Sequence, residues 1–287
     1  MIKAENLSYT YPGASVQTLH GLSFEIAERE IFGFLGPSGA GKSTTQKILT
    51  GLLKSYDGHI EVLGRELKDW GQDYYEHIGV SFELPNHYLK LTALENLNYF
   101  QSLYSGKTER AEEVLEWVGL IDDANKRVGE FSKGMKIRLN VARSLIHCPS
   151  LLFLDEPTSG LDPVNARNIK DLILELRAKG TTVFITTHDM TVADELCDRV
   201  AFITAGRVAT IDQPEALKKQ HGARRIRVEY LNKASAIEQE TFDLDGLGQD
   251  EAFLTLLRSA KRIETMHSQE STLEQVFIEV TGQELGS

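Results

Sequence analysis

The sequence predicts an α/β fold with a mixed central sheet, an antiparallel β flank, an inserted helical subdomain and a small C-terminal α+β module. Three nearly continuous apolar runs predict the central sheet: IFGFL (31–35), SLLFL (150–154) and TTVFIT (181–186). Such runs are typical of parallel strands buried on both faces. We therefore expect the three runs to lie together in one central sheet.

Half-polar segments near the N-terminus predict the antiparallel flank. They are LSYTYP (7–12), VQTLHGLSFEI (16–26) and GHIEVLG (58–64), with glycines at their turns. Between residues about 90 and 147 the pattern becomes helical, with TALENLNYFQSLY (92–104), TERAEEVLEWVGL (108–120) and a helix that begins at Ser132. This stretch is the predicted helical subdomain.

The C-terminal part of the chain has a pattern of its own, so we expect one domain over 1–212 and a small module over 213–287, as a length of 287 residues suggests. RIRVEYL (225–231) and RIETMH (262–267) predict strands, and DLDGLGQDE (243–251) predicts an acidic loop. Two helices are expected, EAFLTLLRS (251–259) and STLEQVFIEVTG (271–282), the second with a capping box formed by Ser271 and Glu274.

Composition excludes several classes of protein. With 31 Lys and Arg against 42 Asp and Glu, the net charge is −11, which should repel nucleic-acid phosphates, so no nucleic-acid partner is expected. The two cysteines, Cys148 and Cys197, lie far apart and predict buried thiols in a reducing compartment. No apolar run reaches the roughly 18 residues of a membrane span, and the start lacks a signal peptide. We expect a cytoplasmic protein unless a partner holds it at a membrane.

GPSGAGKS (36–43) matches G-x-x-x-x-G-K-[ST] and stands between a buried strand and a helix. This context places backbone N–H groups and a helix N-terminus around a phosphate, so the motif predicts a nucleotide-binding P-loop NTPase rather than a ligand-free glycine turn. Lys42 would reach the β and γ phosphates, and Ser43 would bind Mg²⁺. The expected nucleotide-binding residues of this loop are Gly36, Pro37, Ser38, Gly39, Ala40, Gly41, Lys42, Ser43 and Thr44.

SLLFLDEP (150–157) places Asp155 and Glu156 at the end of a buried strand, where open α/β sheets bind ligands. Asp155 fits a partner for Mg²⁺. Glu156 is then placed to act as the general base that polarises the attacking water. A solvated turn is the alternative for an isolated Asp-Glu pair, but the PTSGLD that follows and the distance from the phosphate loop favour the catalytic interpretation.

Taken together, these motifs resemble the nucleotide-binding subunit of an ABC transporter across roughly residues 2–212. FSKGM (131–135) stands where that family has its LSGGQ signature, SGLD (159–162) matches the D-loop with Asp162, and His188 in TTHD matches the catalytic switch histidine. The resemblance implies ATP held in a head-to-tail dimer, either a homodimer or a pair with another nucleotide-binding subunit. Lys42 and Ser43 of one subunit would then face Ser132 and Gly134 of the other.

Several positions near these motifs differ from the family or allow a second interpretation. Tyr11 matches the adenine-stacking aromatic, although Tyr9 and Tyr11 share a strand face and either could belong to the core. Ser132 caps a helix whose first amides would point at the γ-phosphate. Lys133 replaces a glycine, and Met135 replaces a glutamine. In SFELPNH (81–87), Glu83 stands where the family has a glutamine near Mg²⁺, so we expect Glu83 to contribute an oxygen ligand to the metal or to be a solvated loop residue.

The resemblance extends to the C-terminal module, where LEQVFIEVTG (273–282) is similar to the extension of ABC subunits that serve ABC-2 export-type membrane partners. It implies an ATPase that powers export through a separate integral membrane permease and is held peripherally at the inner face of the cell membrane. A packing or dimerisation helix is the simpler interpretation of the segment. Other functions left open are a soluble ABC-type ATPase that acts on DNA or the ribosome and an ABC importer subunit; a simple P-loop kinase would have no use for FSKGM, SGLD and His188.

Overall fold

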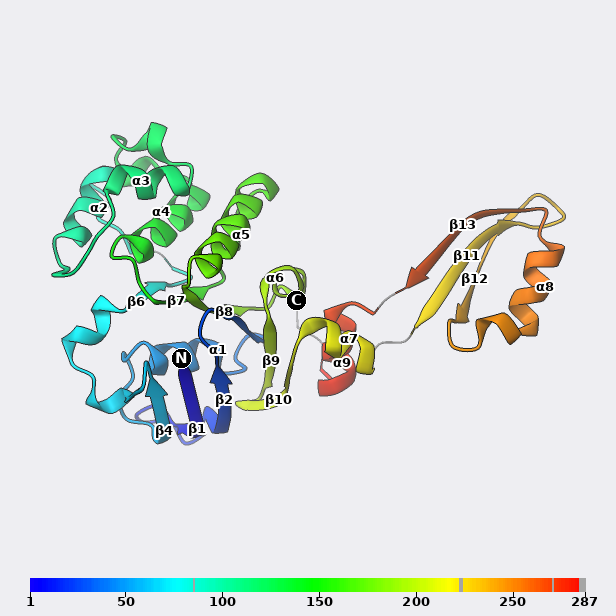
Figure 1. Cartoon of the computed structure of the whole chain (residues 1–287), viewed down its shortest axis with the longest axis horizontal. Helices are drawn as coiled ribbons and strands as arrows, with labels where there is room; N and C mark the ends of the chain where they lie inside the picture. Colours follow the sequence, from blue (N-terminus) through cyan, green and yellow to red (C-terminus); the bar gives the residue numbers. More distant parts are fainter. Residues whose placement is uncertain (85, 222–223, 270, 284–287) are drawn as a thin grey trace. The chain divides into compact units, whose positions relative to one another are not determined.

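The computed structural model describes residues 1–84, 86–221, 224–269 and 271–283. The chain divides into two compact units, Met1–Gln213 and Pro214–Glu284. Figure 1 shows their elements. No helix in the described ranges is long and apolar enough to cross a membrane.

The predicted mixed sheet forms the centre of the first unit; it contains the three predicted strands and three others, in the order β10-β9-β3-β8-β7-β6. All neighbouring pairs are parallel except β9 and β10. The two later apolar runs begin and end one residue further along the chain than expected. The strands are β3 (Ile31–Leu35), β6 (Ile78–Ser81), β7 (Leu151–Asp155), β8 (Thr182–Thr187), β9 (Arg199–Thr204) and β10 (Arg207–Asp212).

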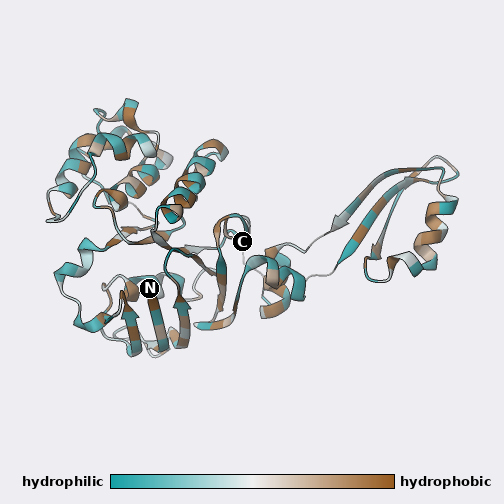
Figure 2. Cartoon of the chain, in the orientation of Figure 1, coloured by the Kyte–Doolittle hydropathy of each residue, from teal (hydrophilic) through white to brown (hydrophobic). Residues whose placement is uncertain are grey.

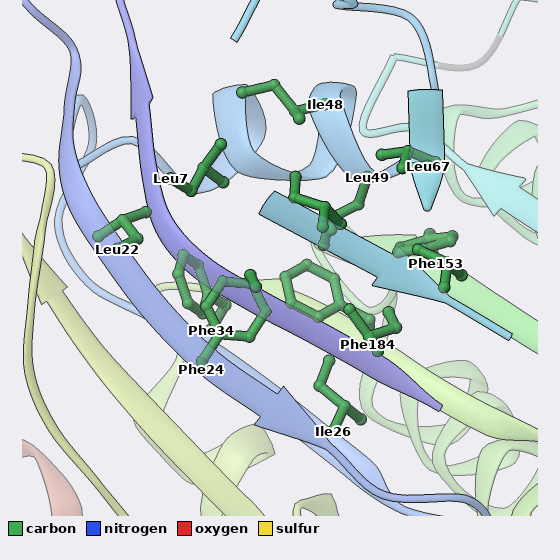
Figure 3. Packing of buried hydrophobic residues seen from close by; sticks show 14 of the residues in the cluster. Leu7, Leu22, Phe24, Ile26, Phe34, Ile48, Leu49, Leu67, Phe153 and Phe184 are labelled. Carbon is green, nitrogen blue, oxygen red and sulfur yellow. The ribbon is translucent and has the colours of Figure 1, made fainter. Parts of the chain in front are cut away.

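The expected antiparallel flank is a four-stranded sheet in the order β2-β1-β4-β5, made of β1 (Ile2–Tyr9), β2 (Leu19–Ile26), β4 (Asp57–Val62) and β5 (Arg65–Glu66). An aromatic core joins it to the central sheet. The ring of Phe34 lies 5.4 Å from that of Phe24 and 5.5 Å from that of Phe184. Ile48 and Leu49 of α1 (Lys42–Leu49) pack into the same cluster (Figure 3).

The helical subdomain contains α2 (Ala93–Gln101), α3 (Ala111–Trp117) and α4 (Lys133–Leu145), and α4 begins at its N-cap Ser132 as predicted. Thr92 and Glu95 form a capping box that starts α2. The unit also contains α5 (Pro163–Ala178) and α6 (Met190–Leu196). Short 3-10 turns lie at Leu67–Asp69, Gln72–Glu76, Ile121–Asp123 and Val128–Glu130.

The second unit contains a three-stranded antiparallel sheet in the order β12-β11-β13, and its core is Val228, Tyr230, Phe242, Phe253 and Leu256. Hydrophobic and hydrophilic residues alternate along β11 (Figure 2). Two elements, α7 and β12, were not predicted. The elements are α7 (Pro214–His221), β11 (Arg225–Leu231), β12 (Ile237–Asp243), a 3-10 turn (Leu247–Gln249), α8 (Glu251–Ser259), β13 (Arg262–Gln269) and α9 (Leu273–Thr281).

Two local predictions are wrong. The capping box of α9 is formed by Thr272 and Gln275, one residue later than the predicted pair Ser271 and Glu274. Cys197 is buried, but Cys148 is exposed and lies in the connection between α4 and β7, where its φ is +52°.

Close packing of α4 against β6 depends on Gly79. A Cβ at this position would lie 2.1 Å from the backbone oxygen of Ser144 in α4. The helix that begins at Ser132 can therefore approach the sheet this closely only if residue 79 has no side chain.

Gly79→Ala should lower the free energy of unfolding by about 1 to 3 kcal/mol or more, because α4 must move away from the sheet. Gly248→Ala is the matched control, since a Cβ there meets no atom within 4 Å. Urea denaturation of both variants measures the difference. Equal stability of the two variants would show that this contact does not restrain α4.

Candidate active site

A cavity of about 310 Å³ lies at the carboxyl edge of the central sheet and brings most of the predicted site residues together. Only Thr18 among its lining residues was not expected, and no motif in the sequence marks it. The lining residues are Thr18, Ser38, Gly39, Gly41, Lys42, Ser43, Thr44, Glu83, Asp155, Glu156 and His188.

The phosphate loop between β3 and α1 needs glycine for steric reasons. A Cβ on Gly36 would lie 2.1 Å from the backbone oxygen of Ile203, and one on Gly41 would lie 2.6 Å from the Leu19 side chain. Gly41, the N-cap of α1, also has a φ of +109°. Its neighbour Ala40 is buried beneath the loop. The loop thus keeps an open row of amides at the start of α1.

Lys42 lies within the loop, where its Nζ donates hydrogen bonds to the backbone oxygens of Gly36 and Pro37 at 2.5 and 3.0 Å. Burial lowers the pKa of Lys42, and the nearby carboxylates of Glu156, Asp155 and Glu83 oppose that shift. A phosphate that entered the cavity would therefore meet an ammonium group held at its floor.

Asp155 ends β7 directly opposite Thr186 of β8. The Thr186 hydroxyl donates a hydrogen bond to the Asp155 carboxylate. Burial raises the pKa of Asp155, the charges of Glu156 and Glu83 raise it further, and the Thr186 hydrogen bond opposes these effects. The Asp155 carboxylate is thus fixed in direction by its neighbour on β8.

Gln46, on the buried face of α1, extends this contact. Its side-chain oxygen lies 3.1 Å from the Thr186 hydroxyl, and its amide nitrogen is buried and has no hydrogen-bond partner in the described part of the chain. One hydroxyl proton cannot serve both Gln46 and Asp155. Because the two ends of an amide are nearly indistinguishable in shape, exchanging them lets Gln46 donate to Thr186 while Thr186 donates to Asp155. Gln46 is a site residue that no motif indicated.

Glu156 is held by the last residue of β8, Thr187, and by His188, which follows it. Its carboxylate accepts hydrogen bonds from the Thr187 hydroxyl at 2.8 Å and from the His188 backbone amide at 2.9 Å. His188 Nδ1 lies 2.6 Å from the same carboxylate. Glu156 also has a φ of +48°, which turns the chain sharply after the strand. The two residues predicted to be catalytic are thus in direct contact.

Glu83 lies on a loop that is fastened to α4. Asn140 Nδ2 donates to the backbone oxygen of Phe82 at 2.7 Å and to the Ser81 hydroxyl at 2.9 Å. His87 Nε2 lies 2.9 Å from the backbone oxygen of Lys136, and burial lowers the pKa of His87 to about 4. Glu83 itself is exposed and lines the cavity.

Tyr11 lies beside the phosphate loop but does not line the cavity. Its hydroxyl is 3.1 Å from the Thr44 hydroxyl, and its ring meets that of Tyr9 edge-on at 4.9 Å between centroids. Tyr9 is buried, whereas Tyr11 is 36% exposed. Of the two tyrosines, only Tyr11 therefore offers a ring to a ligand.

The signature and D-loop residues lie apart from the cavity lining. Ser132 caps α4 by accepting a hydrogen bond from the Met135 amide at 3.2 Å, and Asp162 caps α5. The Lys133 side chain extends across Gly160, where a Cβ would lie 3.5 Å from Lys133 Nζ. Within the described residues, the chain therefore does not bring Ser132, Gly134 and Asp162 to its own nucleotide cavity.

His87 should make the first unit sensitive to acid. Because its pKa is about 4 when folded and 6.5 ordinarily, the unfolded chain binds the extra proton between these values, and stability falls as pH falls. Across this pH range the free energy of unfolding should change by about 3 kcal/mol. In His87→Gln this part of the pH dependence should vanish. The control is His77→Gln, which changes an exposed histidine and should keep the pH dependence. An unchanged slope of melting temperature between pH 4 and 6.5 in His87→Gln would contradict the assignment.

Comparison with known proteins identifies the family. The family model described as "ABC transporter" matches residues 19–159, and the one described as "Fluoroquinolone efflux ABC transporter C-terminal domain" matches residues 224–270. A fluoroquinolones export ATP-binding protein of Mycobacterium tuberculosis is 55% identical over 285 residues, which cover 99% of this chain and 94% of the relative. A bacitracin transport ATP-binding protein of Bacillus licheniformis is 36% identical over 85% of this chain and 80% of its own length.

Solved structures of ABC cassettes have the same fold as this chain. An ATP-binding cassette in a dimeric post-hydrolysis state bound to ADP and Pi superimposes with a TM-score of 0.69 at 30% identity, covering 74% of this chain and 98% of that chain. An ATP-binding subunit of an ABC transporter gives 0.69 at 28% identity, covering 76% and 92%. These findings confirm the predicted fold, the ATPase activity and the export-type relationship. The chain belongs to the ABC transporter family, as an ATP-hydrolysing subunit of the export type.

Proposed function

We propose that this subunit powers the export of fluoroquinolone-type compounds through a separate integral membrane permease. The observation that carries the proposal is the 55% identity to a fluoroquinolones export ATP-binding protein, which covers 99% of this chain. The match of residues 224–270 to the corresponding efflux C-terminal domain supports it, because that match lies outside the ATPase unit. The permease would hold the chain peripherally at the cytoplasmic face of the membrane.

In this proposal the phosphate loop binds the ATP triphosphate. The amides of residues 36–44 surround the β and γ phosphates, and Lys42 leaves its carbonyl partners to neutralise them. Tyr11 stacks on the adenine, since its ring is exposed beside Thr44.

Glu156 is the general base. Its carboxylate is fixed by three contacts and points into the cavity, so it can accept a proton from a water that attacks the γ-phosphate. His188 orients that carboxylate through Nδ1 and is 57% exposed toward the cavity, where its Nε2 can donate a hydrogen bond to the phosphate when both ring nitrogens carry a proton. Within this contacting pair, Glu156 would take the proton of the attacking water, and His188 would stabilise the charge on the phosphate.

The side chains fit a Mg²⁺ ion bound together with ATP. Ser43, Asp155 and Glu83 line the same cavity and supply only oxygen atoms, which Mg²⁺ prefers. In the described residues, no group of three His, Cys, Asp or Glu side chains could hold a metal by itself. Phosphate oxygens would therefore complete the coordination, and the ion would neutralise charge on the phosphates.

A second chain completes the site. Ser132, Gly134 and Asp162 lie apart from the cavity of their own chain, and Ser132 presents the N-terminus of α4. In a head-to-tail dimer the amides of this helix would approach the γ-phosphate bound by the partner. The partner is a second copy or a related ATP-binding subunit; with a net charge of −11, nucleic acid is an unfavourable partner.

The permease would dock on an apolar surface beside Glu83. Large hydrophobic side chains are exposed on the loop that follows Glu83 and on the neighbouring α2: Leu84 (81%), Tyr88 (48%), Leu89 (54%) and Tyr99 (43%). The rings of Tyr88 and Tyr99 are 5.1 Å apart. An exposed apolar patch of this kind marks an interaction surface. A permease bound to this surface would contact the loop that carries Glu83, so a movement of that loop could reach the permease.

Glu156→Gln should keep ATP binding and lose about 10²- to 10⁴-fold in single-turnover hydrolysis, because a general base typically contributes that much. Thr187→Val, which removes one contact of Glu156 but not the base, is the matched control and should lose much less. Hydrolysis by Glu156→Gln within about threefold of wild type would remove Glu156 from the mechanism.

Transport needs a separate test, in cells that express the subunit with its membrane partner. These cells should accumulate less norfloxacin than cells with the Glu156→Gln subunit. Equal accumulation in the two strains would contradict the proposed substrate class while leaving the ATPase assignment intact.

Glu83→Gln should weaken the dependence of hydrolysis on Mg²⁺ and leave nucleotide affinity nearly unchanged, because it keeps an oxygen ligand and removes a negative charge near the γ-phosphate. Glu83→Ala should impair both turnover and transport. Mg²⁺ titrations of ATPase activity measure the first effect, and norfloxacin accumulation measures the second. Wild-type behaviour of both variants would show that Glu83 is only a solvated loop residue.

A further inference from the structure

A second cavity, of about 290 Å³, lies in the first unit at the far end of α1 from the phosphate loop. Aromatic rings form much of its wall, and among the residues that the structure describes two lysines are its only charged lining residues, without any Asp or Glu. These six residues are Tyr56, Trp70, Tyr74, Tyr75, Lys54 and Lys68. Figure 3 shows Ile48 of α1, which also lines the cavity, in the adjoining core.

The charge of this cavity contrasts with the chain as a whole, whose net charge is −11. Lys68 is already engaged: its Nζ donates to the Tyr56 backbone oxygen at 3.2 Å and lies 4.3 Å from the Tyr56 ring centroid. Lys54 is exposed and forms no hydrogen bond or ion pair with the described residues. One ammonium group at the cavity is therefore available to an anion.

Two of the rings, Tyr74 and Trp70, offer apolar surface because their polar ends are occupied elsewhere. The Tyr74 hydroxyl donates to the backbone oxygen of Leu49 at 2.7 Å, and Trp70 Nε1 donates to that of Val62 at 3.1 Å. The Arg65 guanidinium lies 4.8 Å from the Trp70 ring centroid, and the rings of Tyr74 and His77 lie tilted against Trp70 at 5.4 and 5.5 Å, so a ligand meets the part of Trp70 that lines the cavity. Tyr75 is 42% exposed, so a flat ligand can reach its ring.

We infer that this cavity binds a planar, two-ring aromatic carboxylate, with its rings against Trp70 and Tyr75 and its carboxylate on the Lys54 ammonium. The volume of about 290 Å³ lies just below the range for drug-sized ligands, which is about 300 to 1,000 Å³, so the ligand is small. Apolar walls with one free charged group are the usual arrangement of such sites.

This site rests on the proposed function, because fluoroquinolones are planar aromatic carboxylates; it places a binding site for the exported compound class on the ATPase subunit itself. It is distinct from the nucleotide cavity. Lys42, Ser43 and Thr44 of α1 line the nucleotide cavity, whereas Ile48 near the end of the same helix lines this one. Occupancy of the two cavities is therefore expected to be compatible.

Tryptophan fluorescence tests binding directly, because the chain has only two tryptophans, Trp70 and Trp117. In the full chain carrying Trp117→Phe, emission comes from Trp70 alone. Titration with nalidixic acid, a two-ring aromatic carboxylate, should quench that emission saturably, and saturating ATP should not reverse the quenching. Calorimetric titration of the same protein gives an independent dissociation constant.

Lys54→Met, made in the Trp117→Phe chain, should raise the dissociation constant about tenfold, as the loss of a charge-assisted hydrogen bond predicts. The methyl ester of nalidixic acid, which lacks the carboxylate, should bind the Trp117→Phe chain as weakly as the acid binds Lys54→Met. Lys47→Met is the matched control, since Lys47 is exposed on α1 outside the cavity lining, and it should bind normally. Melting temperatures establish that all variants are folded.

Absence of saturable quenching up to about 1 mM, the weak end of the affinity scale, would overturn the proposal. Equal affinity for the acid and its ester, unchanged affinity in Lys54→Met, or displacement by ATP would do the same. The assay needs neither permease nor transport. Binding without norfloxacin export would contradict the proposed function alone, and export without binding would contradict only this site.

Discussion

The parallel register of β3, β8 and β7 decides where the reactive groups of this chain meet. Leu35 pairs with Thr187, and Thr186 pairs with Asp155, so the three strands end at one edge. The phosphate loop, Glu156 and His188 each follow one of these ends directly. Because side chains alternate between the faces of a sheet, a slip of one residue would turn Asp155 away from Thr186. The aromatic core that stabilises this register lies at the same strands, around Phe34 and Phe184.

The helical subdomain depends on this sheet through α4. Gly79 lets α4 lie close to β6, and Asn140 in the middle of the helix holds the loop that carries Glu83. The N-cap of the helix, Ser132, is by contrast exposed at the surface. The loop that contacts nucleotide in one half of the proposed dimer and the helix end that faces the partner therefore belong to one hydrogen-bonded body. This connection gives a physical reason why nucleotide, partner subunit and permease could influence one another.

The parts of the fold that could be predicted from the sequence have a strong local signal. Continuous apolar runs marked the buried strands, the glycine pattern marked the phosphate loop, and Ser132 marked the start of α4. The strand β12 gave no such signal, since most of its residues are exposed and it forms by pairing with β11. At α9, Ser271 and Thr272 are both good caps, each three residues before an acid or amide, so spacing alone could not separate them.

Motif residues and packing residues of the site differ in the same way. Residues inside motifs could be assigned to the cavity, because a motif fixes the backbone around it. Thr18 and Gln46 could not, because they reach the site only through the packing of β2 and α1 against the central sheet. Cys148 was expected to be buried from its residue type, but the turn after α4 places it at the surface. Tertiary context decided each of these positions.

The central claim is that ATP is hydrolysed at a site made by two chains, and mixing two inactive variants tests it most directly. Lys42→Ala removes a group from one half of the site, and Ser132→Ala removes one from the other half. Each variant alone should be nearly inactive. An equimolar mixture should regain about a quarter of wild-type ATPase activity, because half of the randomly formed dimers contain one intact site. A mixture as inactive as its components, or full activity of Ser132→Ala alone, would contradict the account.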